Sequence, residues 1–144
     1  MRIEGQLTIA APPGTVFEVV ADSRNEPRYN PRIAEAVKTS AGPVGAGTTF
    51  LARPRGGRGG SMTVRVVQYD PPRRLGTSVR SASMSTDGGL DLTPVPGGTR
   101  LRWSWDLRLR GAARLLTPLV ALTGSRWERR NWVGLRDYLE ASPS

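Results

Sequence analysis

Hydrophobic and polar residues alternate along most of this chain, most strictly in GGTRLRWSWDLRLRG at residues 97–111. Successive side chains of a β-strand point to opposite faces. One face of this strand would carry Leu101, Trp103, Trp105, Leu107 and Leu109, and the other Arg100, Arg102, Ser104, Asp106, Arg108 and Arg110. The pattern predicts a strand whose tryptophans face the interior and whose arginines face water.

Similar stretches predict six further strands. They span residues 2–10, 33–40, 48–53, 61–69, 75–80 and 83–94, separated by turn-forming segments. The glycine-rich residues 54–60 predict a flexible hairpin tip, and Gly88 and Gly89 predict a bulge or a separate turn in the last of these strands. Because no helical segment separates the strands after residue 33, the sequence predicts an antiparallel meander.

Helical patterns flank this meander. Residues 11–22 open with two prolines and place Val16, Val19 and Val20 on one helical face, although their β-branched side chains would also suit a strand. Prolines allow at most one short helical turn at 24–30. Residues 112–141 have a helical period, and Thr117–Pro118 marks either the start of the main helix or a kink in an earlier one.

The composition narrows the chemistry. The 144 residues suit one domain, expected to span 1–144, and they include neither cysteine nor histidine. Disulfides, thiolate metal sites and imidazole-based triads are therefore excluded. The twelve acidic residues are scattered singly, so we expect neither a metal nor another cofactor. No apolar run reaches the roughly 18 residues of a membrane span and the N-terminus lacks a signal-peptide pattern, so we expect a cytoplasmic protein without a transmembrane segment.

The net charge of +9 comes from twenty arginines and one lysine. Proteins that bind single-stranded nucleic acid place basic and aromatic side chains on one surface. In residues 97–111 the tryptophans and arginines fall on opposite faces, and the other arginines are spread over many segments. This arrangement argues against a nucleic-acid partner.

Several short sequence motifs, spread over nearly the whole chain, together resemble the START-like superfamily. They are IAAPPGTVFEVVAD (9–22), NEPRYNP (25–31), SAGPVGAGTTF (40–50), YDPPRRL (69–75), GGTRLRW (97–103), RLLTPL (114–119) and LRDYLE (135–140). The most similar group is the SRPBCC proteins of the polyketide cyclase/dehydrase and lipid-transport type. The resemblance implies an α+β helix-grip fold. In that fold a curved antiparallel sheet of about seven strands wraps a long C-terminal helix, and two short helices follow the first strand.

The resemblance also implies a cavity between sheet and helix that holds a hydrophobic small molecule. The apolar faces supply candidate lining residues, each of which could equally be ordinary core packing. They are Phe50, Met62, Val64, Met84, Trp103, Trp105, Leu116, Val120 and Trp127, with Tyr29 near the mouth. Arg53 is a candidate polar anchor only if its strand turns Thr49, Leu51 and Arg53 inward rather than Phe50 and Ala52.

Two functions suit this picture. The first is binding or transport of a hydrophobic or amphipathic, lipid- or polyketide-like molecule. The alternative is a cofactor-free polyketide cyclase or dehydratase on the same fold, for which the sequence identifies no catalytic residue and supplies no histidine. Asp22, Glu26 and Asp70 lie at predicted element ends, where capping and turn roles account for them. A homodimer is left open.

Overall fold

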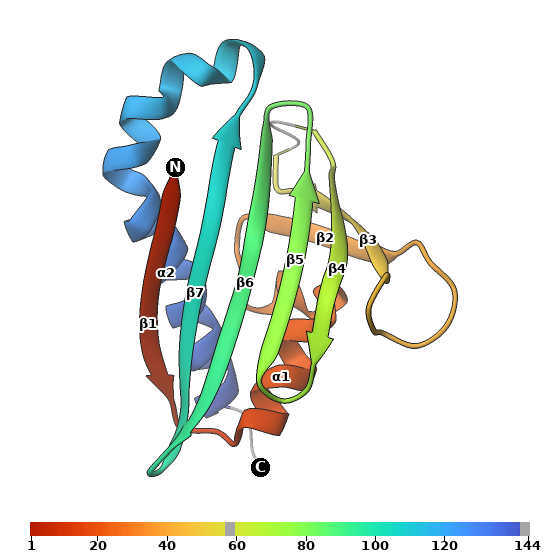
Figure 1. The fold of residues 1–144 in the computed structure, drawn as a ribbon, viewed down its shortest axis with the longest axis vertical. Coiled ribbons are helices and arrows are strands. Elements are labelled where there is room, and N and C mark those ends of the chain that lie inside the picture. The colour runs from red at the N-terminus through yellow and green to blue at the C-terminus, as the bar shows by residue number, and fades with distance from the viewer. Residues whose placement is uncertain (57–59, 142–144) are drawn as a thin grey trace.

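Seven antiparallel strands form one curved sheet in the order β1-β7-β6-β5-β4-β3-β2 (Figure 1). The structure is a computed structural model that describes residues 1–56 and 60–141. Its elements are β1 (Arg2–Ile9), α1 (Pro13–Ala21), the 3₁₀ helix η1 (Ser23–Arg28), β2 (Ile33–Lys38), β3 (Thr49–Pro54), β4 (Met62–Asp70), β5 (Arg74–Arg80), β6 (Met84–Val95), β7 (Gly98–Leu109), the 3₁₀ helix η2 (Gly111–Leu116) and α2 (Thr117–Ala141). The predicted α+β helix-grip architecture is confirmed. Part of the predicted hairpin tip at 54–60 lies outside the described residues.

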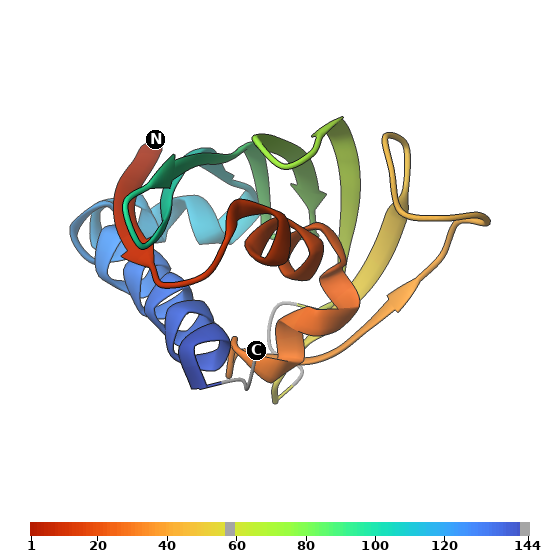
Figure 2. The ribbon, with the colours of Figure 1, turned by 90° about the horizontal axis from the view of Figure 1, so that it is seen from below.

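The helices cover the concave side of the sheet (Figure 2). The long helix α2 runs beside β1, while α1 and η1 lie across one end of the curved sheet. β1 closes the sheet order by pairing with β7, where Ile3 is opposite Trp105 and Leu7 opposite Leu101. The apolar inner face of the sheet is therefore covered by α1, η1 and α2.

The inner face of β7 supplies much of the core, as the alternation predicts. Leu101 and Trp103 are fully buried, whereas Arg100 and Arg102 are exposed on the outer face. The Trp103 ring lies 6.1 Å, centroid to centroid, from that of Trp132 on α2. This contact joins the sheet to the second half of the helix.

The glycine pair in β6 neither bulges nor turns, so that prediction is wrong. β6 runs unbroken, with Gly88 opposite Trp105 and Gly89 opposite Ser104 in one continuous register with β7. Gly88 has φ +153°, and a β-carbon there would collide with the backbone carbonyl of Ser104. The two glycines thus permit a close approach of strands within the curved sheet.

Residues 13–21 form a helix despite their β-branched content, because one side of it is buried. Val16, Phe17 and Val20 pack into the core. The rings of Phe17 and Tyr69 make an edge-to-face contact, with their centroids 5.3 Å apart. Tertiary packing therefore decides what local propensity leaves open.

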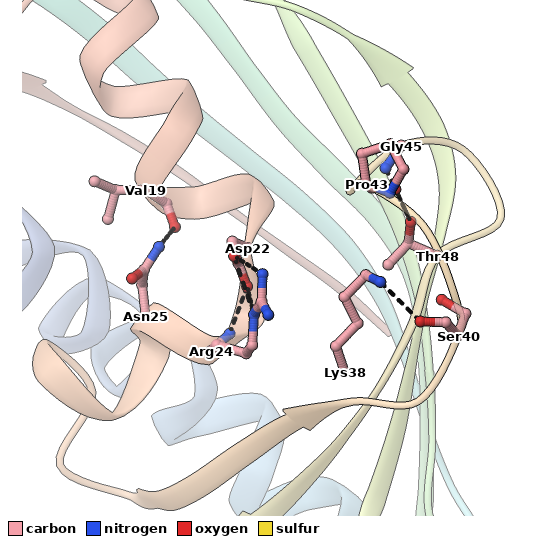
Figure 3. Close-up of polar contacts among 9 residues, drawn as sticks. All are labelled: Val19, Asp22, Arg24, Asn25, Lys38, Ser40, Pro43, Gly45 and Thr48. Atoms are coloured by element: carbon pink, nitrogen blue, oxygen red, sulfur yellow. Dashed lines mark hydrogen bonds and ion pairs between the residues drawn. The ribbon is translucent and has the colours of Figure 1, made fainter.

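Asp22 connects α1 to η1 (Figure 3). Its carboxylate accepts a hydrogen bond from the Arg24 backbone N–H at 3.0 Å and pairs with the Arg24 guanidinium at 2.7 Å. The side-chain amide of Asn25 donates to the Val19 carbonyl at 3.2 Å. These contacts hold η1 against the end of α1, and the side-chain hydrogen bond from Arg24 is the main reason that the pKa of Asp22 is lowered.

The main C-terminal helix begins at Thr117, after η2, so the first of the two predicted alternatives is confirmed. Its second half is buried through Trp132, Leu135 and Leu139. Its first half is not buried in this way, since Leu122 is 80% exposed. Leu115, in η2 just before α2, is 84% exposed. Among the described residues, no helix is long and apolar enough to cross a membrane.

Candidate ligand-binding cavity

A cavity of about 560 Å³ lies between the inner face of the sheet and the helices η1 and α2. Most of its wall is apolar. The strands contribute Ile3, Ala52, Pro54, Met62, Val64, Leu75, Val79, Met84, Leu90, Trp105, Leu107 and Leu109, and the C-terminal helices contribute Leu116, Leu119, Val120, Trp127 and Trp132. The second half of α2 packs on the sheet through the contact of Trp132 with Trp103, whereas its first half lines the cavity through Leu119, Val120 and Trp127.

Most of the lining residues proposed from the sequence lie on this wall. They are Tyr29, Met62, Val64, Met84, Trp105, Leu116, Val120 and Trp127. Phe50 and Trp103 face the same side of the sheet but are packed in the core, 0% and 1% exposed, and are not part of the wall. Trp103 is covered by Trp132, whereas Trp105, two residues further along β7, reaches the cavity.

The orientation of β3 removes Arg53 from the cavity. Phe50 and Ala52 point inward and are buried, so Arg53 lies on the outer face. There its guanidinium pairs with the carboxylate of Glu35, its partner in register on β2. Arg53 is therefore not the polar anchor that one reading of the strand suggested.

A group of polar side chains from three parts of the chain meets at the cavity instead. Glu26 comes from η1, Trp105 from β7, and Glu128 and Asn131 from α2. Residues three apart on a helix share a face, so Glu128 and Asn131 lie on the same side of α2, and both line the cavity. We call these four residues the polar cluster.

Each carboxylate of the polar cluster is held by one neighbour. The Asn30 side-chain amide donates to Glu26 Oε1 at 3.0 Å. The Trp132 indole N–H donates to Glu128 Oε1 at 3.0 Å, one helical turn along α2. Both carboxylates are thereby fixed at the wall of the cavity.

Burial raises the pKa of both carboxyl groups. For Glu26 the hydrogen bond from Asn30 opposes this rise, and the nearby charge of Glu128 adds to it. For Glu128 the Trp132 N–H and the positive charge of Arg32 oppose the rise. Burial also raises the pKa of the Tyr29 hydroxyl well above its ordinary value.

Two polar atoms of the cluster are buried without a hydrogen-bond partner among the described residues. They are Trp105 Nε1 and Asn131 Oδ1. The Trp105 N–H lies close enough to Glu128 to lower the pKa of that carboxyl, although the structure holds no hydrogen bond between them. Leaving a buried donor or acceptor unpaired costs about 1–3 kcal/mol.

Sequence reasoning missed the polar cluster, apart from Trp105. It assigned Glu26 to a helix end and did not consider Glu128 or Asn131. One signal was present: Val120, Gly124, Trp127 and Asn131 follow one another at spacings of four, three and four, so Asn131 continues an inward-facing stripe. Among residues 1–56 and 60–141, no three acidic side chains are grouped closely enough to hold a metal ion.

The curved sheet, the long C-terminal helix and the cavity between them define a helix-grip protein. The chain belongs to the family described as polyketide cyclase / dehydrase and lipid transport, whose model matches residues 1–140. An uncharacterized protein of Mycobacterium tuberculosis H37Rv is 32% identical over 141 residues, covering 92% of this chain and 81% of that protein.

Solved structures share the fold at lower sequence identity. The protein TTHA0849 of Thermus thermophilus matches with a TM-score of 0.79 and 18% identity, covering all of both chains. The Zhui aromatase/cyclase of Streptomyces sp. R1128 matches with a TM-score of 0.74 and 19% identity, over 96% of this chain and 93% of that one. At these identities the likeness concerns the fold.

Proposed function

We propose that this protein binds or transports a hydrophobic or amphipathic small molecule in the cavity between the sheet and α2. The observation that carries the proposal is the wall itself: apolar side chains from β1, β3 to β7 and α2 surround the space, and polar groups gather at one part of it. Ligand sites are mostly apolar cavities of roughly 300–1,000 Å³ with a few fixed polar groups. The volume of about 560 Å³ fits this range.

The family supports the same proposal, because its description includes lipid transport. The exposed leucines at the start of α2 lie beside lining residues of that helix, so an apolar molecule would meet apolar side chains at the rim. Met62 and Met84 add flexible side chains to the wall, which suits ligands of variable shape.

The test is native mass spectrometry of gently purified protein, repeated after denaturing extraction. We expect a discrete extra mass that leaves with the solvent. The variant Val79→Phe replaces a small side chain on the cavity wall with a bulky ring that fills part of the space, and should lose the extra mass. Val67→Phe, at a position 56% exposed on β4, should keep it. Equal retention by both variants would place the ligand outside the cavity.

A second candidate is a cofactor-free cyclase or dehydratase, and Glu26 and Glu128 favour it. A carboxyl group whose pKa is raised toward neutrality is better suited to exchange protons with a substrate. Both groups line the cavity and both are shifted in that direction by burial. Glu26→Gln would then retain ligand binding but abolish product formation from a polyketide-like substrate. If turnover survives in this variant, Glu26 has no catalytic role.

The remaining partner hypotheses stay predictions. On the outer face, Arg53, Arg74 and Arg80 lie within 4.0 Å of carboxylates, which reduces the positive charge available to phosphates. A nucleic-acid complex would be recognised by affinity that falls steeply with salt. Sedimentation would decide between a monomer and a homodimer.

A further inference from the structure

Within the four residues of the polar cluster, hydrogen-bond acceptors outnumber unused donors. The polar cluster presents many acceptors: the carboxylates of Glu26 and Glu128, and the unpartnered Asn131 Oδ1. Against them it offers one unused buried donor, the Trp105 Nε1–H. Asn131 is only 7% exposed, so its free oxygen is buried at the cavity.

Trp105 and Glu128 both line the cavity, from β7 and α2 respectively. The Trp132 N–H occupies Glu128 Oε1 and leaves Oε2 for another donor. The Trp105 N–H acts on the same carboxyl without completing a hydrogen bond to it. An atom that accepts from Trp105 and carries a hydrogen for Glu128 would satisfy both groups.

We propose that the cavity selects an apolar molecule bearing a neutral hydroxyl group, whose oxygen accepts from Trp105 Nε1–H and whose hydrogen is donated to Glu128. This inference rests on the proposed function and specifies the class of ligand. A hydroxyl group is the simplest group that is both a donor and an acceptor. Asn131 Oδ1 provides an acceptor for a second hydroxyl on the same molecule.

Other head groups fit less well. A carboxylate has no hydrogen to donate and would be buried beside Glu26 and Glu128, which repel it. The nearby cation, Arg32, lies at an exposed position with its guanidinium 5.2 Å from the centroid of the Trp127 ring. An ammonium group would pair with the carboxylates but cannot accept the Trp105 hydrogen bond.

The experiment compares four probes that share one apolar body: 4-octylphenol, 4-octylanisole, 4-octylbenzoate and 4-octylbenzylamine. Each is titrated into the full chain at pH 8 and followed by tryptophan fluorescence. The anisole replaces the donated hydrogen with a methyl group that meets Glu128. Loss of one hydrogen bond to a charged group corresponds to about tenfold or more in affinity, so the phenol should bind at least tenfold more tightly than the other three.

Two matched variants assign the effect to the indole N–H. Trp105→Phe keeps an aromatic ring on the wall but removes the donor, so it should weaken binding of the phenol, which accepts from that donor, and leave the amine, which cannot accept, nearly unchanged. Trp127→Phe makes the same change elsewhere on the wall and should alter all four affinities by a similar factor, preserving the preference. Circular dichroism checks that both variants are folded.

The possible outcomes separate the two proposals. Equal affinity for the four probes, tighter binding of the amine or benzoate, or a preference for the phenol over the amine that is undiminished in Trp105→Phe would overturn the hydroxyl assignment while leaving a ligand-binding cavity. Failure of all four probes to bind would count against both the assignment and the proposed function.

Discussion

Gly134 of α2 lies directly against the backbone carbonyl of Tyr29, and a β-carbon at this position would collide with that oxygen. The contact brings the second half of the helix onto the segment between η1 and β2. The Tyr29 and Tyr138 rings lie 6.4 Å apart, centroid to centroid, in the same region. These contacts fix the second half of α2 against this segment, while its first half lines the cavity.

Gly134→Ala should therefore destabilise the protein. Alanine gains up to about 1 kcal/mol in helix propensity, but inserting a methyl group against fixed backbone costs typically about 1–3 kcal/mol, so we expect a net loss of roughly 1 kcal/mol. Urea denaturation measures the change. The control is Gly14→Ala in α1, where a β-carbon would meet open space. This variant should be neutral or more stable by a few tenths of a kcal/mol, roughly half the difference in helix propensity between glycine and alanine. A stabilised Gly134→Ala variant would contradict the close contact.

The burial of Glu128 predicts a pH-dependent effect on stability. Its pKa is raised in the folded state, so folded protein holds this proton at pH values where the unfolded chain has released it. The stability that this bound proton adds to the folded state is complete below the pKa of the unfolded chain, near 4.5. It is lost as pH rises through the higher pKa of the folded state. Burial of Glu26 acts in the same direction, and the positive charge of Arg32 opposes it at both groups.

Glu128→Gln removes this loss because the amide cannot ionise. The variant should match the wild type in free energy of unfolding at pH 4 and exceed it at pH 8. The exposed Glu18→Gln variant should show no such trend. A difference between Glu128→Gln and the wild type that is constant from pH 4 to pH 8 would mean that the carboxyl is not buried in the folded protein.

Asp22 should behave as a capping residue. Its carboxylate accepts the Arg24 backbone N–H, as Figure 3 shows, and replacement of such a cap by alanine typically costs about 1 kcal/mol. We expect Asp22→Ala to lose this amount in thermal or urea unfolding. Asp137→Ala, at an exposed site on α2, should stay within about 0.5 kcal/mol of the wild type. Equal losses at the two positions would remove the capping role.

The two halves of α2 should respond differently to the same substitution. Leu135 is fully buried, so Leu135→Ala should cost about 2–5 kcal/mol. Leu122 is 80% exposed, so Leu122→Ala should change stability by no more than about 0.5 kcal/mol. A large loss at Leu122 would show that the first half of the helix is covered in solution, by a second copy of the chain or by the sheet.

The strand pattern was predictable because its cause is local. Side chains alternate every residue along a strand, so the period alone separates Leu101, Trp103 and Trp105 from the outer arginines. The order of the elements and the short motifs that resemble the START-like superfamily were also visible in the sequence. The glycine pair in β6 was misinterpreted, because its reason is the neighbouring backbone at Ser104 rather than a local turn.

The elements, the inward faces of most strands and the apolar character of the interior therefore follow from the local pattern of residues. The folded arrangement was needed to show that Arg53 faces outward, that Phe50 and Trp103 are core rather than wall, and that Glu26, Trp105 and Glu128 meet. These three residues are far apart in the chain, and their meeting depends on the curvature of the sheet and the tilt of α2. Both arise from packing between distant segments, which no local pattern encodes.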